Sequence, residues 1–460
     1  MPRHTWFDRL LRLSHPDAAS TPAPPVEGLV LSGGGARASF QLGALRYLYE
    51  RARIAPTRIL GTSAGSIAAT ILAQSADPAA QAGYLAELEE LWLAMNDASQ
   101  MFTEQAWFTR LRNQWDDLAA LLPQPGEAGA PPGDETTVTE TDPARRLEEA
   151  MTDDPSQDMA PGPAIWQLLG LLPRLGRAGA GLATTVRGAE RAASAYRPGP
   201  LVHRLLFESG FKASRVPASG VQLRIAFVDL NSGALRFMRQ DGIIVDRDDR
   251  PVDATRYELA LGVWASCSIP GVFRPVQLGQ AVCVDGGIRE NVPVELAVNS
   301  LGVTKPYVVA ASPPGVEAGD FSAKDMVSVL LRTAAITWDE TVQDEIGWAR
   351  AAGACVIEPH IDVHGAMTVE PALLRINRDH GWIRAAEEVT GAPGSLRDID
   401  DAIIAARCDW AKLENPPAGQ SPDDKAEQVS GIQARLAELL SQADPALLPP
   451  NATTWPTPLA

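Results

Sequence analysis

Hydrophobic positions follow the periods of helices and buried strands over two stretches of this chain, residues 28–100 and 220–362. In the first stretch an apolar run ends in three glycines, and apolar residues three or four positions apart follow it. A short strand is expected at 58–60, then a helix of small residues, then a further helix at about 79–96. This order of strands and helices predicts a parallel α/β unit.

The second stretch continues the α/β pattern. Two strands within 221–240 are joined by an Asn-Ser-Gly turn, which predicts a hairpin. Another strand is expected at 281–284, and a long amphipathic helix at 326–350. The expected divisions of the chain are an amphipathic and linker segment at 1–25, an α/β domain at 26–385, and a helical, Pro-rich tail at 386–460.

The sequence between the two stretches, at about 101–219, predicts an insertion in this domain. Residues 125–163 contain ten acidic and two basic residues with many Pro, Gly and Thr, which is typical of loosely held or disordered chain. Residues 164–204 contain six Arg and one Glu beside Leu-rich turns. These arginines could pair with the acidic part to close a lid, or could bind anionic lipid head groups. Both alternatives stay open at the level of the sequence.

The charge and composition exclude several classes of protein. The 460 residues are 45% hydrophobic and carry a net charge of −17, so the chain is globular and lacks the basic footprint of a nucleic-acid-binding protein. Four widely spaced cysteines form neither a disulfide framework nor a zinc motif. With no secretory signal and no apolar run long enough to span a membrane, we expect a cytoplasmic protein that contacts membranes peripherally. The excess of Arg over Lys and the abundant Ala indicate a bacterial origin.

The first candidate for chemistry is Gly61-Thr62-Ser63-Ala64-Gly65, a G-x-S-x-G motif between an expected strand and an expected helix. This context is that of a nucleophile elbow, in which a sharp turn exposes the serine hydroxyl at a helix N-terminus. Gly61 and Gly65 would let the strand and the helix approach closely. Ser63 is therefore the candidate nucleophile.

The second candidate is the loop Ser32-Gly33-Gly34-Gly35-Ala36-Arg37-Ala38, between the first strand and the first helix. A dinucleotide-binding loop is disfavoured, because no acidic residue ends a second strand about 20 positions further on. Bare backbone amides at a helix N-terminus bind anions, and beside a nucleophile they form an oxyanion hole. Arg37 could hold this loop or meet a phosphate.

The third candidate is Asp285-Gly286-Gly287, expected at the end of a parallel strand. Sites in open α/β sheets lie outside the carboxyl ends of the strands, so Asp285, Ser63 and the glycine loop should converge. An aspartate beside a serine can act as its base if burial raises its pKa.

Taken in order, SGGGARA, GTSAG, ASCSIPGVFRPV and VDGG resemble the patatin-like phospholipase family over residues 26–100 and 220–385. The resemblance implies a three-layer fold with a central, mostly parallel sheet, and hydrolysis of lipid esters by a Ser–Asp dyad without histidine. Ser63 would be the nucleophile, Asp285 the base, and amides around Gly34 and Gly35 the oxyanion hole. The implied partners are a lipid substrate and a membrane surface, and neither a cofactor nor a metal is needed. Ala38 stands where the family usually has glycine.

Two other readings compete with the dyad. A Ser–His–Asp esterase could use Ser63, Asp285 and either His360 or His364, which follow in the chain order of such triads. Alternatively, the chain could be a non-catalytic protein that binds membranes or partners through its tail and insertion. Retention of the nucleophile motif argues against the second reading, because a strained elbow serves little without chemistry.

Overall fold

The computed structural model describes residues 24–105, 194, 196–205, 211–316, 318–319, 326–414 and 422–455. The chain divides into two compact units, which are described separately. The first unit holds the described residues of 1–100, 200–268 and 276–460, and the second holds those of 101–199 and 269–275. The acidic stretch of the expected insertion, most of its basic stretch, and nearly all of the expected segment at 1–25 lie outside the described residues.

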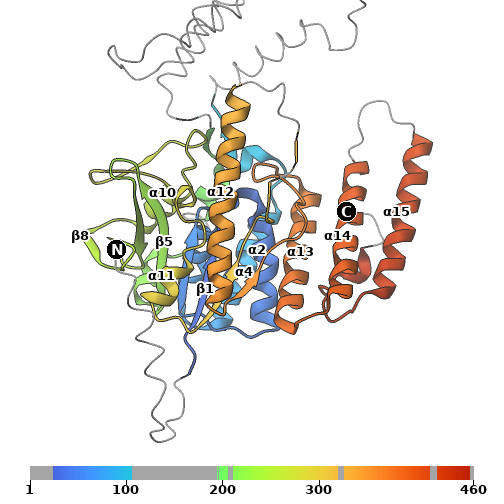
Figure 1. Ribbon diagram of the computed structural model, residues 1–460, viewed down its shortest axis with the longest axis horizontal. Helices are drawn as coiled ribbons and strands as arrows, with labels where there is room; N and C mark the ends of the chain where they lie inside the picture. Colours follow the sequence, from blue (N-terminus) through green and yellow to red (C-terminus); the bar gives the residue numbers. More distant parts are fainter. Residues whose placement is uncertain are drawn as a thin grey trace, which may run out of the picture. The chain divides into compact units, whose positions relative to one another are not determined.

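A ten-stranded sheet forms the centre of the first unit (Figure 1). Five strands, counted from one edge, run parallel to one another, and three continue the sheet antiparallel. In spatial order the parallel strands are β12 (Cys355–Ile357), β11 (Lys305–Val309), β1 (Glu27–Leu31), β2 (Arg58–Thr62) and β5 (Gln222–Asp229). The antiparallel continuation is β6 (Ala234–Arg239), β7 (Ile243–Val245) and β8 (Pro251–Arg256), and its first pair confirms the hairpin predicted from the sequence. The remaining two strands, β9 (Val276–Leu278) and β10 (Ala281–Asp285), join the sheet through β5.

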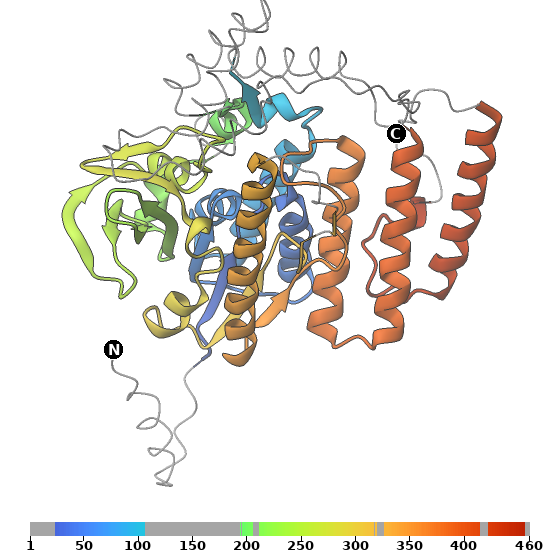
Figure 2. The same ribbon diagram turned by 45° about the horizontal axis from the view of Figure 1, so that its top comes forward.

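Helices cover both faces of the sheet because its central strands are apolar on both sides. Val30, Leu60 and Val308 belong to a core shared with α11 (Val294–Asn299) and α12 (Met326–Ala351). Helix α12 lies across the strands in Figures 1 and 2. The intervening residues of β1 and β2 are also fully buried and point to the opposite face by the period of two. Helices α2 (Ala38–Glu50), α3 (Ala64–Leu72) and α4 (Pro78–Leu93) pack together there.

Helix α13 (Pro371–Thr390) crosses α2 so closely that the contact requires glycine on both helices. A Cβ on Gly43 would lie 1.7 Å from the carbonyl oxygen of Arg378, and one on Gly381 would lie 1.9 Å from that of Phe40. Asn377 of α13 also donates to the carbonyl of Arg37 and to the Ser39 hydroxyl, at 3.1 and 2.9 Å. Helix α13 therefore fixes the start of α2, where the glycine loop ends.

The C-terminal helices extend this packing, and the expected boundary at residue 385 falls inside α13. Helices α14 (Gly394–Glu414) and α15 (Pro422–Gln442) pack against each other, and α14 packs against α13. A second hydrophobic cluster joins the three helices through Ile383, Ile403 and Leu436. Among the described residues, no helix is both long enough and apolar enough to cross a bilayer.

In the second unit, the start of the expected insertion pairs with residues 196–198, which come before its expected end at about 219. Strand β3 (Phe102–Glu104) pairs antiparallel with β4 (Tyr196–Pro198). The ring of Phe102 stacks on Phe273 with centroids 5.7 Å apart, and the Tyr196 amide donates to the Val272 carbonyl at 2.9 Å. Residues 269–275 thus belong with this hairpin, while the described residues from Pro200 onward return to the first unit.

We expect Gly381→Ala to lower the free energy of unfolding by about 3 kcal/mol, because the methyl group would overlap the α2 backbone and force the two helices apart. Gly347→Ala is the matched control, since Gly347 is an exposed residue of α12 with no atom near its Cβ position. That control should be neutral or stabilising by up to about 1 kcal/mol. Urea denaturation measures both, and equal effects would contradict the close crossing.

Candidate active site

Ser63 lies in the turn between β2 and α3, in the strained conformation of a nucleophile elbow. Its φ of 51° and ψ of −128° fall where residues with a Cβ are rare. The flanking glycines make the turn possible: a Cβ on Gly61 would lie 2.5 Å from the Gly65 carbonyl oxygen, and one on Gly65 would lie 2.5 Å from the carbonyl oxygens of Leu31 and Ser32. Helix α3 therefore starts against β1, and its positive end faces the Ser63 side chain.

Two other serines hold the strained backbone of Ser63. Its amide donates to the hydroxyl of Ser266 at 2.8 Å, and its carbonyl accepts from the hydroxyl of Ser66 at 2.6 Å. Ser266 ends α10 (Leu259–Ser266) and is fully buried. A conformation that costs of order 1–3 kcal/mol persists only where such contacts determine it from several sides.

Asp285 reaches Ser63 by a different geometry from the one expected. We expected it at the end of a parallel strand, and this was wrong: β10 (Ala281–Asp285) runs antiparallel to β5. The reason is that β10 is the returning strand of a hairpin with β9 (Val276–Leu278), with Gly279 at a φ of 60° in the connection.

The two strand ends meet on one edge of β5. Strand β6 occupies the other edge, so β2 and β10 share the remaining one. Thr62 pairs with Ala226, and Asp285 pairs with the next residue, Phe227. The last residues of β2 and β10, Thr62 and Asp285, therefore pair with adjacent positions of β5. Because Ser63 directly follows Thr62, it lies beside Asp285.

The Asp285 carboxyl is buried and held on one side only. Its Oδ1 accepts from the Gly287 amide at 2.8 Å, and its own amide donates to the Ser268 carbonyl at 3.0 Å. Burial raises the pKa of Asp285 from 3.8 to about 7, while the Ser63 hydroxyl and the Gly287 amide act in the opposite direction. Oδ2 makes no hydrogen bond of ordinary geometry with the described residues. The Ser63 hydroxyl is thus near the carboxyl without being tightly bound to it, as is frequent before substrate tightens a catalytic pair.

The glycine loop passes directly beside Ser63. A Cβ on Gly33 would lie 2.8 Å from the Cβ of Ser63. From Gly33 to Arg37, three amides have acceptors: Gly33 donates to Asn291 Oδ1, Ala36 to the Ala366 carbonyl and Arg37 to the Gly34 carbonyl. Within the described residues, the amides of Gly34 and Gly35 have no acceptor. These are the two residues at which the family resemblance implies an oxyanion hole, and both have a donor to offer.

Arg37 fastens the loop to a neighbouring segment. Its Nε donates to Asp362 at 3.0 Å and to the His364 carbonyl at 2.9 Å, and its Nη2 completes an ion pair with Asp362. Of the two roles expected for Arg37, these contacts supply that of holding the loop.

The histidines of the alternative triad have other partners. His360 Nδ1 lies 3.0 Å from Asp401 Oδ2. His364 is buried, with Nδ1 at 3.0 Å from the Gly365 carbonyl and Nε2 at 3.4 Å from Ser39 Oγ. Burial lowers the pKa of His364. In the part of the chain that the structure describes, neither ring hydrogen-bonds to Ser63 or Asp285.

Sequence reasoning missed three residues that touch the site or hold it: Ser266, Asn291 and Glu345. Asn291 Oδ1 lies 2.8 Å from the Gly33 amide, and Glu345 accepts from the amides of Asn291 and Val292. Ser266 stands in the segment ASCS, which could have drawn attention, whereas no local pattern marks the other two.

A family model described as patatin-like phospholipase matches residues 29–298, more than half of the chain. The chain belongs to the patatin-like phospholipase family. The match covers the glycine loop, Ser63 and Asp285, and this membership makes lipid acyl hydrolysis the activity to explain. None of the curated protein sequences matches this chain.

Solved structures of patatin-like proteins are similar to this chain at low identity. VipD from Legionella pneumophila shares 15% identity over 94% of this chain and 90% of its own, with a TM-score of 0.37. The type III effector ExoU from Pseudomonas aeruginosa shares 14% over 95% and 72%, with a TM-score of 0.28. Human GIVD cytosolic phospholipase A2 shares 14% over 73% of this chain and 44% of its own, with a TM-score of 0.29. At these scores the family assignment rests on the family model.

We expect Asp285→Asn to stabilise the protein above pH 7. Between 3.8 and about 7, the folded chain retains a proton on Asp285 that the unfolded chain has lost, so the stability contributed by this group falls as the pH rises through that window. Asparagine removes this loss, which corresponds to at most about 4 kcal/mol. The difference in melting temperature between variant and wild type should be small at pH 4 and reach several degrees at pH 8.

Asp344→Asn is the control for this comparison, because it removes the same charge from an exposed position on α12. Its melting temperature should follow that of the wild type at both pH values. A gain for Asp285→Asn that is the same at pH 4 and pH 8 would contradict the raised pKa.

Proposed function

We propose that this protein is a serine lipid acyl hydrolase that cleaves carboxylic esters of lipids, with Ser63 as nucleophile and Asp285 as base. One observation carries the proposal: two strand ends that meet on one edge of β5 bring an elbow serine to a buried aspartate with a free oxygen. Family membership supports the substrate class. The glycine loop beside Ser63 supplies two amides that have no acceptor among the described residues.

In the acylation step, Asp285 Oδ2 takes the proton of the Ser63 hydroxyl as Oγ attacks the ester carbonyl carbon. The carbonyl oxygen becomes an oxyanion, which the Gly34 and Gly35 amides stabilise by hydrogen bonds. Collapse of the tetrahedral intermediate breaks the ester C–O bond, and the proton held by Asp285 goes to the departing alcohol or lysolipid. Ser63 is left as an acyl ester.

In the deacylation step, Asp285 takes a proton from water as the water oxygen attacks the acyl carbonyl carbon. Collapse of the intermediate breaks the bond to Ser63 Oγ and releases the fatty acid, and Asp285 returns the proton to Oγ. A base works best when its pKa lies near the working pH, and burial brings that of Asp285 to about 7. The Gly287 amide keeps Oδ1 oriented, so Oδ2 remains the oxygen that faces the chemistry. The turnover rate should therefore rise with pH through about 7.

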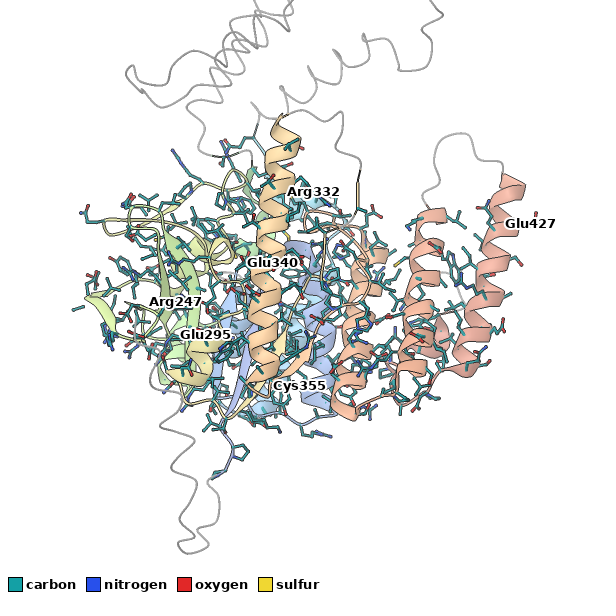
Figure 3. All side chains as sticks on the ribbon, in the orientation of Figure 1. Arg247, Glu295, Arg332, Glu340, Cys355 and Glu427 are labelled. Carbon is teal, nitrogen blue, oxygen red and sulfur yellow. The ribbon has the colours of Figure 1, made fainter. Side chains whose placement is uncertain are left out.

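An apolar surface beside the dyad supports a lipid substrate. A Cβ on Gly287 would lie 3.1 Å from Cζ2 of Trp338, so this indole borders the turn that follows Asp285. Trp338 is 38% exposed and Ile288, in the same turn as Gly287, is 47% exposed. Trp338 belongs to α12, between Arg332 and Glu340 in the sequence, and Figure 3 labels both of these residues on that helix. Exposed Trp and Ile next to a catalytic turn suit contact with acyl chains or a membrane surface.

Turnover of p-nitrophenyl butyrate and release of fatty acid from phospholipid vesicles test the dyad. Ser63→Ala and Asp285→Asn should each lower kcat by roughly 10³–10⁶-fold, as the loss of one of several catalytic residues that act together does in serine hydrolases. His360→Ala and His364→Ala should keep activity within about threefold, because their rings contact other residues. Loss of activity in a folded histidine variant would favour a triad, and a wild type without Ser63-dependent turnover would favour a binding protein.

Trp338→Ala tests the apolar surface. We expect release of fatty acid from vesicles to fall about tenfold, the value of burying part of one large apolar side chain, while turnover of the soluble butyrate ester stays within about twofold. Val389→Ala, at an exposed position at the end of α13, is the control and should change neither rate. Equal losses on both substrates would refute a role of Trp338 in lipid contact.

A further inference from the structure

The side-chain oxygen of Asn291 lies between the glycine loop and the aspartate turn. Asn291 is 4% exposed, and its Oδ1 accepts from the Gly33 amide at 2.8 Å. The same oxygen would be 2.7 Å from a Cβ on Gly33 and 3.1 Å from a Cβ on Gly287. Gly33 is the loop residue that touches Ser63, and Gly287 is the residue that hydrogen-bonds to Asp285. One amide oxygen therefore contacts both halves of the site.

Glu345 holds Asn291 from α12. Its Oε2 accepts from the Asn291 amide at 3.0 Å and from the Val292 amide at 2.7 Å. Burial raises the pKa of Glu345 to about 8, while those two amides act against the rise. Two hydrogen bonds from consecutive amides fix the path of the chain, and with it the place of the Asn291 side chain.

Further charged groups surround the hydrogen bonds between Glu345 and the Asn291 segment. Glu290 is buried and forms an ion pair with Arg247, and Arg247 lies beside Glu295 of α11 (Figure 3). Glu290 and Arg247 also act on the pKa of Glu345, in opposite directions. The segment 290–292 is thus held by α12 on one side and by the β7–β8 turn on the other, so it is a rigid support for Asn291.

We propose that Asn291, held by Glu345, is a positioning residue that sets the oxyanion-hole amides of the glycine loop against the Ser63–Asp285 dyad. This inference rests on the proposed function. The bond to Asn291 engages the Gly33 amide and so fixes the Ser32–Gly33 peptide, from which the chain leads into Gly34 and Gly35. The two amides that follow, on Gly34 and Gly35, are those for which the described part of the chain provides no acceptor. Donors of this kind are effective only when their direction is fixed before the reaction.

An amide side chain suits this position better than a carboxylate. It offers the acceptor that the Gly33 amide needs, and it adds no negative charge beside Asp285, Glu345 and Glu290. A carboxylate at residue 291 would raise the pKa of Asp285 further through like-charge repulsion and would leave less of the base ionised at neutral pH. It would still hold the Gly33 amide.

The test compares kcat and KM for p-nitrophenyl butyrate in variants that remove or keep each acceptor. Asn291→Ala and Glu345→Ala should lower kcat by about 10- to 100-fold with KM within about threefold, a loss smaller than that of removing a hole donor itself. Glu345→Gln keeps an oxygen for the two amides and should stay within about threefold of the wild type. Asn291→Asp, assayed at pH 9 where Asp285 is ionised, should recover most of the kcat that Asn291→Ala loses.

Asp344→Ala is the matched control for Glu345→Ala, because it changes the adjacent, exposed residue of α12. It should leave kcat unchanged. The nearly isosteric Asn291→Asp and Glu345→Gln keep the test valid if an alanine variant fails to fold, since thermal melting reports folding for each protein.

Several outcomes overturn the inference while leaving the proposed function standing. These are a kcat for folded Asn291→Ala within twofold of the wild type, a rise in KM alone, or the same loss in Glu345→Gln as in Glu345→Ala. By contrast, a wild type whose turnover is unchanged by Ser63→Ala overturns the proposed function and this inference together.

Discussion

The site depends on one constraint, which is that two strands share a single edge of β5. Strand β2 occupies that edge up to Ala226 and β10 occupies it from Phe227, so neither strand can extend further. The backbone must therefore turn away from β5 where each strand ends, and Ser63 and Asp285 lie at these two turns. Glycine makes both turns possible, because a Cβ on Gly286 would lie 2.7 Å from the Ala226 carbonyl oxygen, only slightly further than the 2.5 Å contacts at Gly61 and Gly65.

Residues around this junction hold Ser63 and Asp285 in place through hydrogen bonds. The backbone strain at Ser63 is held by Ser266 and Ser66, and the buried carboxyl of Asp285 is held by Gly287. Burial is unfavourable for the charged carboxylate, and the same burial moves its pKa to the range where a base is useful. In the mechanism that we propose, stability and chemistry are therefore in conflict at Asp285.

Local sequence was sufficient to mark the candidate residues whose signal lies in adjacent positions. Three motifs can be recognised from neighbouring residues alone. They are the elbow serine between glycines, the triple-glycine loop and Asp-Gly-Gly. The direction of β10 was predicted wrongly, because an apolar run of four residues reads the same in either orientation. Asn291 and Glu345 were missed because their partners are distant in the chain: Gly33 and Asn291 are 258 positions apart. Only the folded structure shows which residue accepts the hydrogen bond of the Gly33 amide.

Covalent trapping tests the central claim most directly. A fluorophosphonate with an alkyl chain reacts with a serine only when a base and an oxyanion hole act on it. Mass spectrometry of the intact protein and of its peptides should find one adduct, on Ser63, formed in the wild type and in His360→Ala and His364→Ala. The rate of labelling should rise with pH through about 7, and Asp285→Asn should stay unlabelled. An adduct on another serine, or labelling that persists in Asp285→Asn and disappears in a folded histidine variant, would contradict the dyad.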